Sequence, residues 1–186
     1  IAANRVFAIL DIQDQVQENG MIEAPHFEGK LSFQDVRFGY INDEEVIKGI
    51  NLEVNPGETI AIVGSTGAGK STIINLLNRF YEINSGTISI DGRNINEFEL
   101  KSLRKQIAVV LQDVFLFADT ILNNITLDNP NITREDVIEA AQKIGVHEFI
   151  MTLPNGYDYN VKERGVMLSS GQRQLIAFLR AYVSNP

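Results

Sequence analysis

The sequence predicts an α/β fold, and three patterns support this prediction. An apolar run at residues 59–63, typical of a buried strand, leads into a glycine-rich loop and then into a helical pattern at residues 71–80. At residues 31–38 the side chains alternate between two faces with a period of two residues, which is typical of a strand. Residues 115–167 carry apolar side chains mostly at helical spacing. Helices and strands mixed in this way indicate an α/β protein.

Composition narrows the classes of function. The 186 residues suffice for one globular domain or one with a modest insert, and a hydrophobic content of 44% supports a real core. The net charge of −8 does not favour nucleic acid or an anionic membrane, so local geometry must hold any anionic ligand. The absence of cysteine excludes disulfides and thiolate metal sites. No apolar run approaches the roughly 18 residues of a membrane span, and we expect a soluble chain.

The first part of the chain is expected to lead into the loop through a short sheet. Residues 1–14 predict a short helix, and residues 13–23 a helix tail and linker. The alternation at residues 31–38 is imperfect, which favours a strand near a sheet edge. Residues 46–54 hold further strand candidates, and a turn is predicted at Asn55-Pro56-Gly57-Glu58.

The glycine-rich loop fits the phosphate-binding pattern G-x-x-x-x-G-K-[ST] in full, with the residues Gly64, Ser65, Thr66, Gly67, Ala68, Gly69, Lys70, Ser71 and Thr72. Glycines let the backbone wrap an anion closely and accept positive φ. Backbone N–H groups at the start of the following helix add partial positive charge. Lys70 supplies a full charge for the β- and γ-phosphates, and the Ser71 hydroxyl suits Mg²⁺. The alternative is a glycine-rich turn with a solvent-exposed lysine.

Two residues near the loop have both a functional and an ordinary interpretation. Tyr40 follows the strand at residues 31–38, where an aromatic ring could stack on a nucleotide base. A half-buried tyrosine is the simpler interpretation of that residue alone. Gln112 directly follows residues 107–111, an apolar run typical of a strand covered on both faces. Its amide could ligate Mg²⁺ or orient a water, and a turn residue is an equally good interpretation.

After the helix at residues 71–80, a strand closed by a turn is expected at residues 86–92 and a helix at residues 100–106. The segment at residues 115–167 is predicted to be mostly helical. Thr133 and Asp136 approximate a capping box at the start of a helix that Gly145 ends. Another short helix is stopped by Pro154-Asn155-Gly156. We interpret the two histidines, His26 and His147, as surface or packing residues.

A second chemical element is Leu168-Ser169-Ser170-Gly171-Gln172-Arg173-Gln174, followed by apolar residues at helical spacing. A serine before a helix is usually an N-cap. Two serines and a glycine at the positive end of a helix can also hold an anion. From the local pattern alone, the cap is the simpler interpretation.

Together these elements resemble the nucleotide-binding domain of an ATP-binding-cassette transporter of the exporter type. Residues 168–172 are similar to the LSGGQ signature of that family, with Ser170 where glycine is usual. Residues 163–165 are similar to the ERG segment of exporters, with Lys162 in place of a glycine. Residues 1–11 look like the tail that joins a membrane helix to this domain.

The resemblance implies a P-loop ATPase core with an antiparallel β edge and a helical subdomain. The implied domains are a tail from a transmembrane domain at residues 1–24, a core at residues 25–114 and 165–186, and the helical subdomain at residues 115–164. The implied ligands are ATP and Mg²⁺. Lys70 and Gln112 take catalytic roles, Ser71 and Gln112 hold the metal, and Tyr40 stacks on adenine.

By the same resemblance, two such domains pair head to tail. ATP held by residues 64–72 of one is closed over by Ser169, Gly171 and Gln172 of the other. The partners are then a transmembrane domain and a second nucleotide-binding domain at the cytoplasmic face of the cell membrane, in a parent protein that hydrolyses ATP. The Walker B strand and switch histidine of the family are missing before Pro186. We therefore expect the chain by itself to bind nucleotide weakly and to hydrolyse it negligibly.

Three other functions fit part of the pattern. A kinase or GTPase would explain residues 64–72 but not residues 168–174, and no N-K-x-D segment of GTPases occurs. A non-transport ATPase of the same family shares both elements, but the acidic charge offers no nucleic-acid footprint. A nucleotide-sensing module without turnover is the third alternative.

Overall fold

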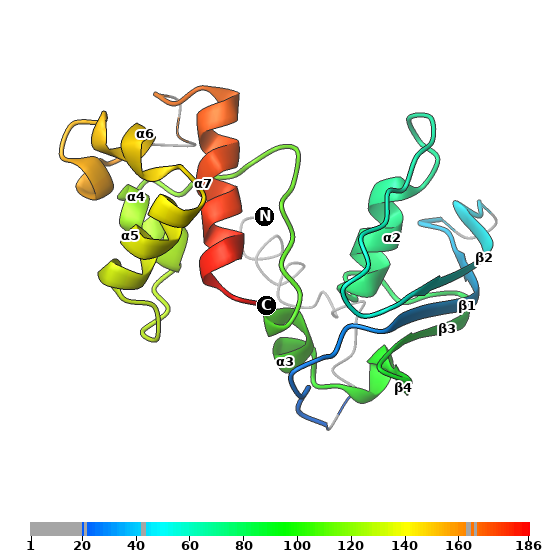
Figure 1. Cartoon of the computed structure of the whole chain (residues 1–186). Helices are drawn as coiled ribbons and strands as arrows, with labels where there is room; N and C mark the ends of the chain where they lie inside the picture. Colours follow the sequence, from blue (N-terminus) through cyan, green and yellow to red (C-terminus); the bar gives the residue numbers. More distant parts are fainter. Residues whose placement is uncertain (1–19, 21, 42–43, 163–164, 166) are drawn as a thin grey trace, which may run out of the picture. The chain divides into compact units, whose positions relative to one another are not determined.

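The computed structural model describes residues 20, 22–41, 44–162, 165 and 167–186 (Figure 1). The chain divides into two compact units, residues 1–106 and residues 107–186. The helix and linker predicted at residues 1–23 lie almost entirely outside the described residues. The finer domain boundaries given by the resemblance remain a prediction.

The first unit contains an antiparallel sheet in the order β2-β1-β3-β4. Its strands are β1 (Leu31–Phe38), β2 (Ile47–Val54), β3 (Ser85–Ile90) and the short β4 (Arg93–Asn94), and Figure 1 shows β2, β1 and β3 side by side. The strands predicted from residues 31–38, 46–54 and 86–92 are confirmed. Residues 31–38 lie near a sheet edge as expected, because β1 is the neighbour of the edge strand β2, although it pairs with β3 as well.

A β-bulge explains the imperfect alternation of β1. Asp35 has a positive φ of 43°, and the pairing register shifts on both sides of the strand between Phe33 and Arg37. An extra residue at a bulge reverses the parity of the side chains that follow. Phe33, Val36 and Phe38 are consequently all buried, although a regular strand would place Phe33 and Val36 on opposite faces.

Two apolar runs predicted as strands do not form them. Residues 59–63 and residues 107–111 form neither strand nor helix, and they pair with no strand of the described sheet. A strand needs a neighbour to pair its N–H and C=O groups, and the order of the described sheet includes neither run. Val63 is 87% exposed and Leu111 is 59% exposed, so the buried strand expected at residues 59–63 and the burial on both faces expected at residues 107–111 are also wrong.

The helices of the first unit agree with the sequence pattern. Helix α2 (Lys70–Leu77) follows the glycine-rich loop and buries Ile73 and Leu76. A single 3-10 turn, η1 (Ile95–Glu97), precedes α3 (Leu100–Lys105). Arg104 of α3 donates to the carbonyl oxygens of Asn78 and Arg79, which directly follow α2. These bonds satisfy carbonyl groups that a helix end leaves without partners.

The second unit is helical, as predicted for residues 115–167. It contains α4 (Ile121–Thr126), α5 (Arg134–Lys143), α6 (His147–Met151), η2 (Gly156–Asp158) and α7 (Ser170–Val183). Figure 1 shows α7 beside α4 and α5, and both pairs are in contact. The unit has one apolar core, formed by Leu116, Ile121, Ile125, Val137, Ala140, Ala141, Val146, Ile150, Tyr157, Val161, Leu168, Ile176 and Leu179.

Helix ends in this unit follow the sequence closely. The capping box predicted at Thr133 is present: Asp136 N donates to the Thr133 hydroxyl, and Thr133 N donates to the Asp136 carboxylate. Gly145 follows the end of α5 with a φ of 72°, as expected of a residue that closes a helix. No helix of the described residues combines the length and apolar character that a membrane crossing requires.

Candidate nucleotide-binding site

The phosphate-binding pattern forms an open loop that ends in a helix. Ala68 N donates to the carbonyl oxygen of Ser65 across 3.2 Å, which closes a turn inside the loop. Gly69 is the N-cap of α2, and no side chain caps that helix start. Residues 63–68 are exposed. The backbone N–H groups at the start of α2 therefore lie beside an accessible loop, where a helix favours negative charge.

Gly69 joins this loop to the sheet. Its φ is 87°, and an added Cβ would lie 2.7 Å from Cδ1 of Ile47 and 3.3 Å from Cγ1 of Val46. The backbone conformation strains any other residue at this position, and a Cβ would require the end of the Ile47 side chain to shift. The sequence pattern explains the glycine by its conformation, and the structure adds the contact with β2.

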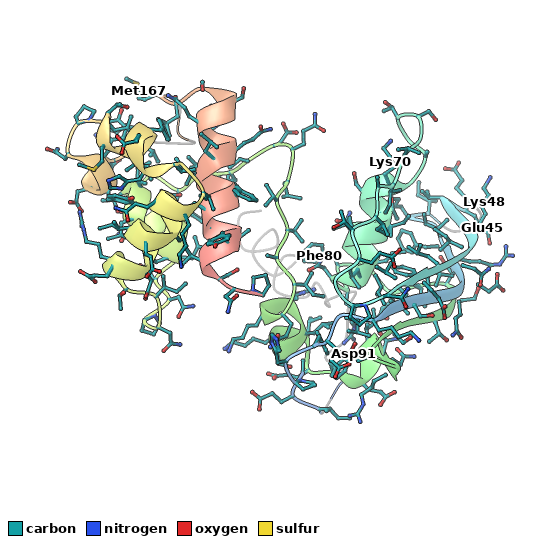
Figure 2. The ribbon with its side chains drawn as sticks, in the orientation of Figure 1. Glu45, Lys48, Lys70, Phe80, Asp91 and Met167 are labelled. Atoms are coloured by element: carbon teal, nitrogen blue, oxygen red, sulfur yellow. The ribbon has the colours of Figure 1, made fainter. Side chains whose placement is uncertain are left out.

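Lys70 lies across the loop. Its Nζ donates to the carbonyl oxygens of Gly64 at 2.9 Å and Ser65 at 2.7 Å. Figure 2 shows Lys70 at one end of α2 and Phe80 beyond the other. The ammonium group is thus positioned within the loop, which argues against the alternative of a solvent lysine beside a glycine turn. The hydroxyl-bearing Ser71 is exposed at the start of the same helix.

Tyr40 lies next to the helix that follows the loop. Its hydroxyl is 3.1 Å from Oγ1 of Thr72, and Thr72 itself is buried. The Tyr40 side chain is 50% exposed. The structure therefore brings Tyr40 and the phosphate-binding pattern together within the first unit, as a base-stacking role requires, and leaves part of the ring accessible.

The second chemical element begins α7. Ser169 is the N-cap: its Oγ accepts a hydrogen bond from Gln172 N, and its own N donates to Gln172 Oε1. The cap interpretation of Ser169 is therefore confirmed. The hydroxyl accepts within the cap and keeps its own proton to donate elsewhere. Ser169, Ser170 and Gly171 are exposed, and nothing lies within 4 Å of a Cβ placed on Gly171.

Gln112 belongs to the second unit and contacts α7. Its carbonyl oxygen accepts a hydrogen bond from Gln174 Nε2 at 3.4 Å, and its side chain is exposed. This contact links the segment after residues 107–111 to the helix that Ser169 begins. The metal role of Ser71 and Gln112 remains a prediction, and the described residues contain no cluster of His, Cys, Asp and Glu that could hold a metal by itself.

The remaining predicted residues divide between packing and the part that is not described. His147 Nδ1 lies 3.0 Å from the Tyr157 hydroxyl, which agrees with a packing role, and His26 is exposed. Of the segment similar to ERG, Glu163 and Arg164 lie outside the described residues. Gly165 is described, with a φ of 63° and Leu116 Cδ1 2.9 Å from the position of an added Cβ.

Comparison with known proteins places this site in a family. The family model described as "ABC transporter" matches residues 47–186, which include the glycine-rich loop and the start of α7. The chain belongs to the ABC transporter family. The prediction of an ABC ATPase fold is thereby confirmed, together with the resemblance stated from the sequence.

The similar proteins point in the same direction. The chain is 48% identical over 166 residues to the "Putative multidrug export ATP-binding/permease protein YgaD" of Bacillus subtilis, which covers 89% of the chain and 29% of that protein. It is 44% identical over 186 residues to the "Uncharacterized ABC transporter ATP-binding protein YknV" of the same organism, covering 100% of the chain and 31% of that protein. The chain thus spans about a third of the length of these relatives.

A solved structure shows the same fold. The "Structure of a bacterial Atm1-family ABC exporter with ATP bound" matches with a TM-score of 0.92 and 40% sequence identity. The match covers 99% of this chain and 32% of that one. The ATP-binding-cassette ATPase fold of this chain therefore rests on both sequence and structure.

Proposed function

We propose that this chain is the ATP-binding and ATP-hydrolysing motor domain of an ABC exporter. The observation that carries the proposal is the hydrogen bond between Tyr40 and Thr72, because it joins a partly exposed aromatic ring to the helix of the phosphate-binding loop. A ring that stacks on a base and a loop that wraps a triphosphate are the two halves of an ATP site. The names of the relatives and of the solved exporter support the transport role.

The residues of the chain fit ATP and Mg²⁺. Residues 64–69 offer backbone N–H groups to the phosphates, and Lys70 offers an ammonium group that already lies in the loop. The Ser71 hydroxyl is a hard oxygen donor of the kind that Mg²⁺ prefers, and Gln112 offers an amide oxygen. Mg²⁺ would neutralise charge on the phosphates during hydrolysis. Gln112 would hold the attacking water in place.

The second half of the proposal is a shared site. Ser169 and Gly171 of one domain close over the triphosphate bound by another, and the exposed start of α7 supports this role. Each charge-assisted hydrogen bond gained on closure is worth about 1.5–3 kcal/mol. Closure of the pair then moves attached transmembrane domains at the cytoplasmic face of the membrane, and hydrolysis separates the pair again.

Titration calorimetry with Mg-ATP and sedimentation velocity test the two halves. We expect the chain to bind Mg-ATP and to associate in its presence. Ser169→Ala should abolish the association without changing the binding to the isolated domain. Thr133→Ala is the matched control, because Thr133 caps α5 with the same kind of capping box. Each substitution should cost about 1 kcal/mol of stability.

Two results would each contradict one half of the proposal. Absence of Mg-ATP binding would refute the nucleotide role. Equal effects of Ser169→Ala and Thr133→Ala on ATP-dependent association would show that Ser169 acts only as a cap.

A further inference from the structure

Tyr40 belongs to a cluster of three aromatic rings in the first unit. The ring of Phe38 lies 4.9 Å from that of Tyr40 at an interplanar angle of 83°, and the ring of Tyr81 lies 5.0 Å away at 88°. Phe38 and Tyr81 are also in contact, with centroids 5.6 Å apart. Phe38 is buried, whereas half of the Tyr40 surface is exposed. Two rings therefore hold Tyr40 nearly at right angles and leave part of it accessible.

Tyr81 reaches this cluster because the chain after α2 is bonded to the end of β1. Asn84 N donates to the carbonyl oxygen of Arg37 at 2.9 Å, and Gly39 N donates to Asn84 Oδ1 at 2.8 Å. Arg37 and Gly39 lie on either side of Phe38 and directly precede Tyr40 in the sequence. The segment that carries Tyr81 is thus fixed to the segment that carries Tyr40.

The tip of the Tyr40 ring has a third contact. Its hydroxyl lies 3.1 Å from Thr72 Oγ1, in the first turn of α2. A ring held by Phe38, Tyr81 and Thr72 has few other rotamers to occupy, so it loses little conformational entropy when a ligand stacks on it. Such preorganisation raises affinity without any new contact to the ligand.

We propose that Tyr81 is a positioning residue that holds the Tyr40 ring in the orientation in which it stacks on the base of ATP. This inference rests on the proposed function and adds a residue to it. Tyr81 acts only through Tyr40, so its contribution belongs to the base and not to the triphosphate. Removing Tyr81 therefore lowers the affinity for ATP while the affinity for a triphosphate without a base stays the same.

The test compares two ligands by titration calorimetry on the full chain: Mg-ATP and Mg-tripolyphosphate. The quantity of interest is the ratio of the two affinities. Tyr81→Leu should lower this ratio about three- to tenfold, and Tyr40→Ala should lower it by at least as much. Tyr81→Phe keeps the ring and should keep the ratio.

Phe80→Leu is the matched control. Phe80 is the neighbouring aromatic residue and is 46% exposed, and its ring lies against the guanidinium of Arg104, 4.9 Å from the centroid. Figure 2 labels it beyond the end of α2 opposite Lys70. Phe80→Leu removes the same ring from the same segment and should leave the ratio unchanged.

Tyr81→Met, which keeps apolar bulk, serves as a second variant if thermal unfolding shows that Tyr81→Leu does not fold. A ratio that stays constant in these two variants overturns the inference. An equal loss of affinity for both ligands also overturns it, because Tyr81 would then support the loop as a whole. Failure of the unchanged chain to bind either ligand would instead refute the proposed function.

Discussion

Lys70 donates from Nζ to the carbonyl oxygen of Ser65 across 2.7 Å, within the loop that its own helix follows. Under the proposed function, a phosphate group that entered the loop would give Nζ a charged acceptor in place of this carbonyl. Hydrogen bonds between charged partners are roughly twice as strong as bonds to neutral groups. The hydrogen bonds of the Lys70 ammonium group would therefore become stronger when a phosphate binds, and the ammonium group would stay within the loop.

Lys70→Ala should lower the affinity for Mg-ATP by about 10- to 100-fold, since the lost charge-assisted bonds are worth about 1.5–3 kcal/mol. Stability should change by less than about 0.5 kcal/mol, because the carbonyl groups of this exposed loop can bond to water instead. Titration calorimetry and thermal unfolding measure the two effects. Lys105→Ala removes the same charge from an exposed position on α3 and should change neither. Equal affinities in the two variants would contradict the role of Lys70.

Gly69→Ala should destabilise the fold more than Gly67→Ala does. Both glycines have positive φ, 87° and 83°, so each alanine carries a backbone cost of about 1–2 kcal/mol. Only at Gly69 does the new Cβ meet another side chain, 2.7 Å from Cδ1 of Ile47, whereas Gly67 faces open space. The end of the Ile47 side chain must then shift, which adds about 1 kcal/mol.

Urea denaturation of these glycine variants measures the difference. Adding Ile47→Val to Gly69→Ala removes the methyl group in conflict and should recover part of the loss. The same Ile47→Val change in the unaltered chain should instead cost about 0.5–1.5 kcal/mol. Equal midpoints for the two alanine variants would show that the Ile47 side chain moves away from the new Cβ at no cost.

The loop, its helix and the helix caps were predictable because their signals are local. Gly69 and Lys70 lie within one short pattern, and the Thr133 capping box is contained in four residues. The resemblance to a family also assigned Tyr40 to the site, and the Tyr40–Thr72 contact agrees with that assignment. The place of Tyr81 was not predictable, because it depends on the bonds that Asn84 makes to Arg37 and Gly39 at the end of β1.

The errors in strand prediction have a related cause. The pattern at residues 59–63 and 107–111 reports apolar character, but a strand forms only where another strand accepts its hydrogen bonds. The bulge at Asp35 is likewise decided by pairing on both sides of β1, where Asp35 N bonds to Asn51 Oδ1. The side-chain alternation alone therefore indicated a strand near a sheet edge but could not show that β1 has a partner on each side.

Asn124→Ala should cost about 2–4 kcal/mol of stability. Asn124 is fully buried, and its side chain accepts from Phe117 N at 2.8 Å and donates to the carbonyl oxygens of Phe117 and Thr120 at 3.0 Å each. The substitution leaves Phe117 N without its acceptor, at a cost of about 1–3 kcal/mol, and removes two donated bonds worth about 1 kcal/mol each. The carbonyl oxygens of Phe117 and Thr120 keep their backbone bonds from Asp119 N and Asn124 N. The comparison is Asn123→Ala, which loses one side-chain bond to Asp119 and should cost about 1 kcal/mol. Similar urea midpoints for both variants would contradict the stabilising role of the three Asn124 side-chain hydrogen bonds.

Asp158→Asn should reduce stability at neutral pH and lose its effect in acid. Arg134 of α5 donates to both carboxylate oxygens of Asp158 in η2, at 2.9 and 2.8 Å. Hydrogen bonding to Arg134 lowers the pKa of Asp158 from its ordinary value of 3.8. A folded-state pKa below the unfolded value means that the carboxylate stabilises the fold above about pH 4 and loses this contribution as the pH falls through the folded-state pKa.

The measurement is the urea midpoint of the unaltered chain and of Asp158→Asn, from about pH 7 down to about pH 3. The gap between the two should be widest at neutral pH and should narrow as the pH falls from about 4 through the folded-state pKa, below which Asp158 is neutral like asparagine. The pKa of Asp136 is also lowered, by the Thr133 hydroxyl, but Asp136 is present in both proteins and cancels in the difference. Glu53→Gln removes an exposed carboxylate and should show no such pH-dependent gap. A gap for Asp158→Asn that stays constant across the range would mean that the Arg134 pair does not depend on the charge of Asp158.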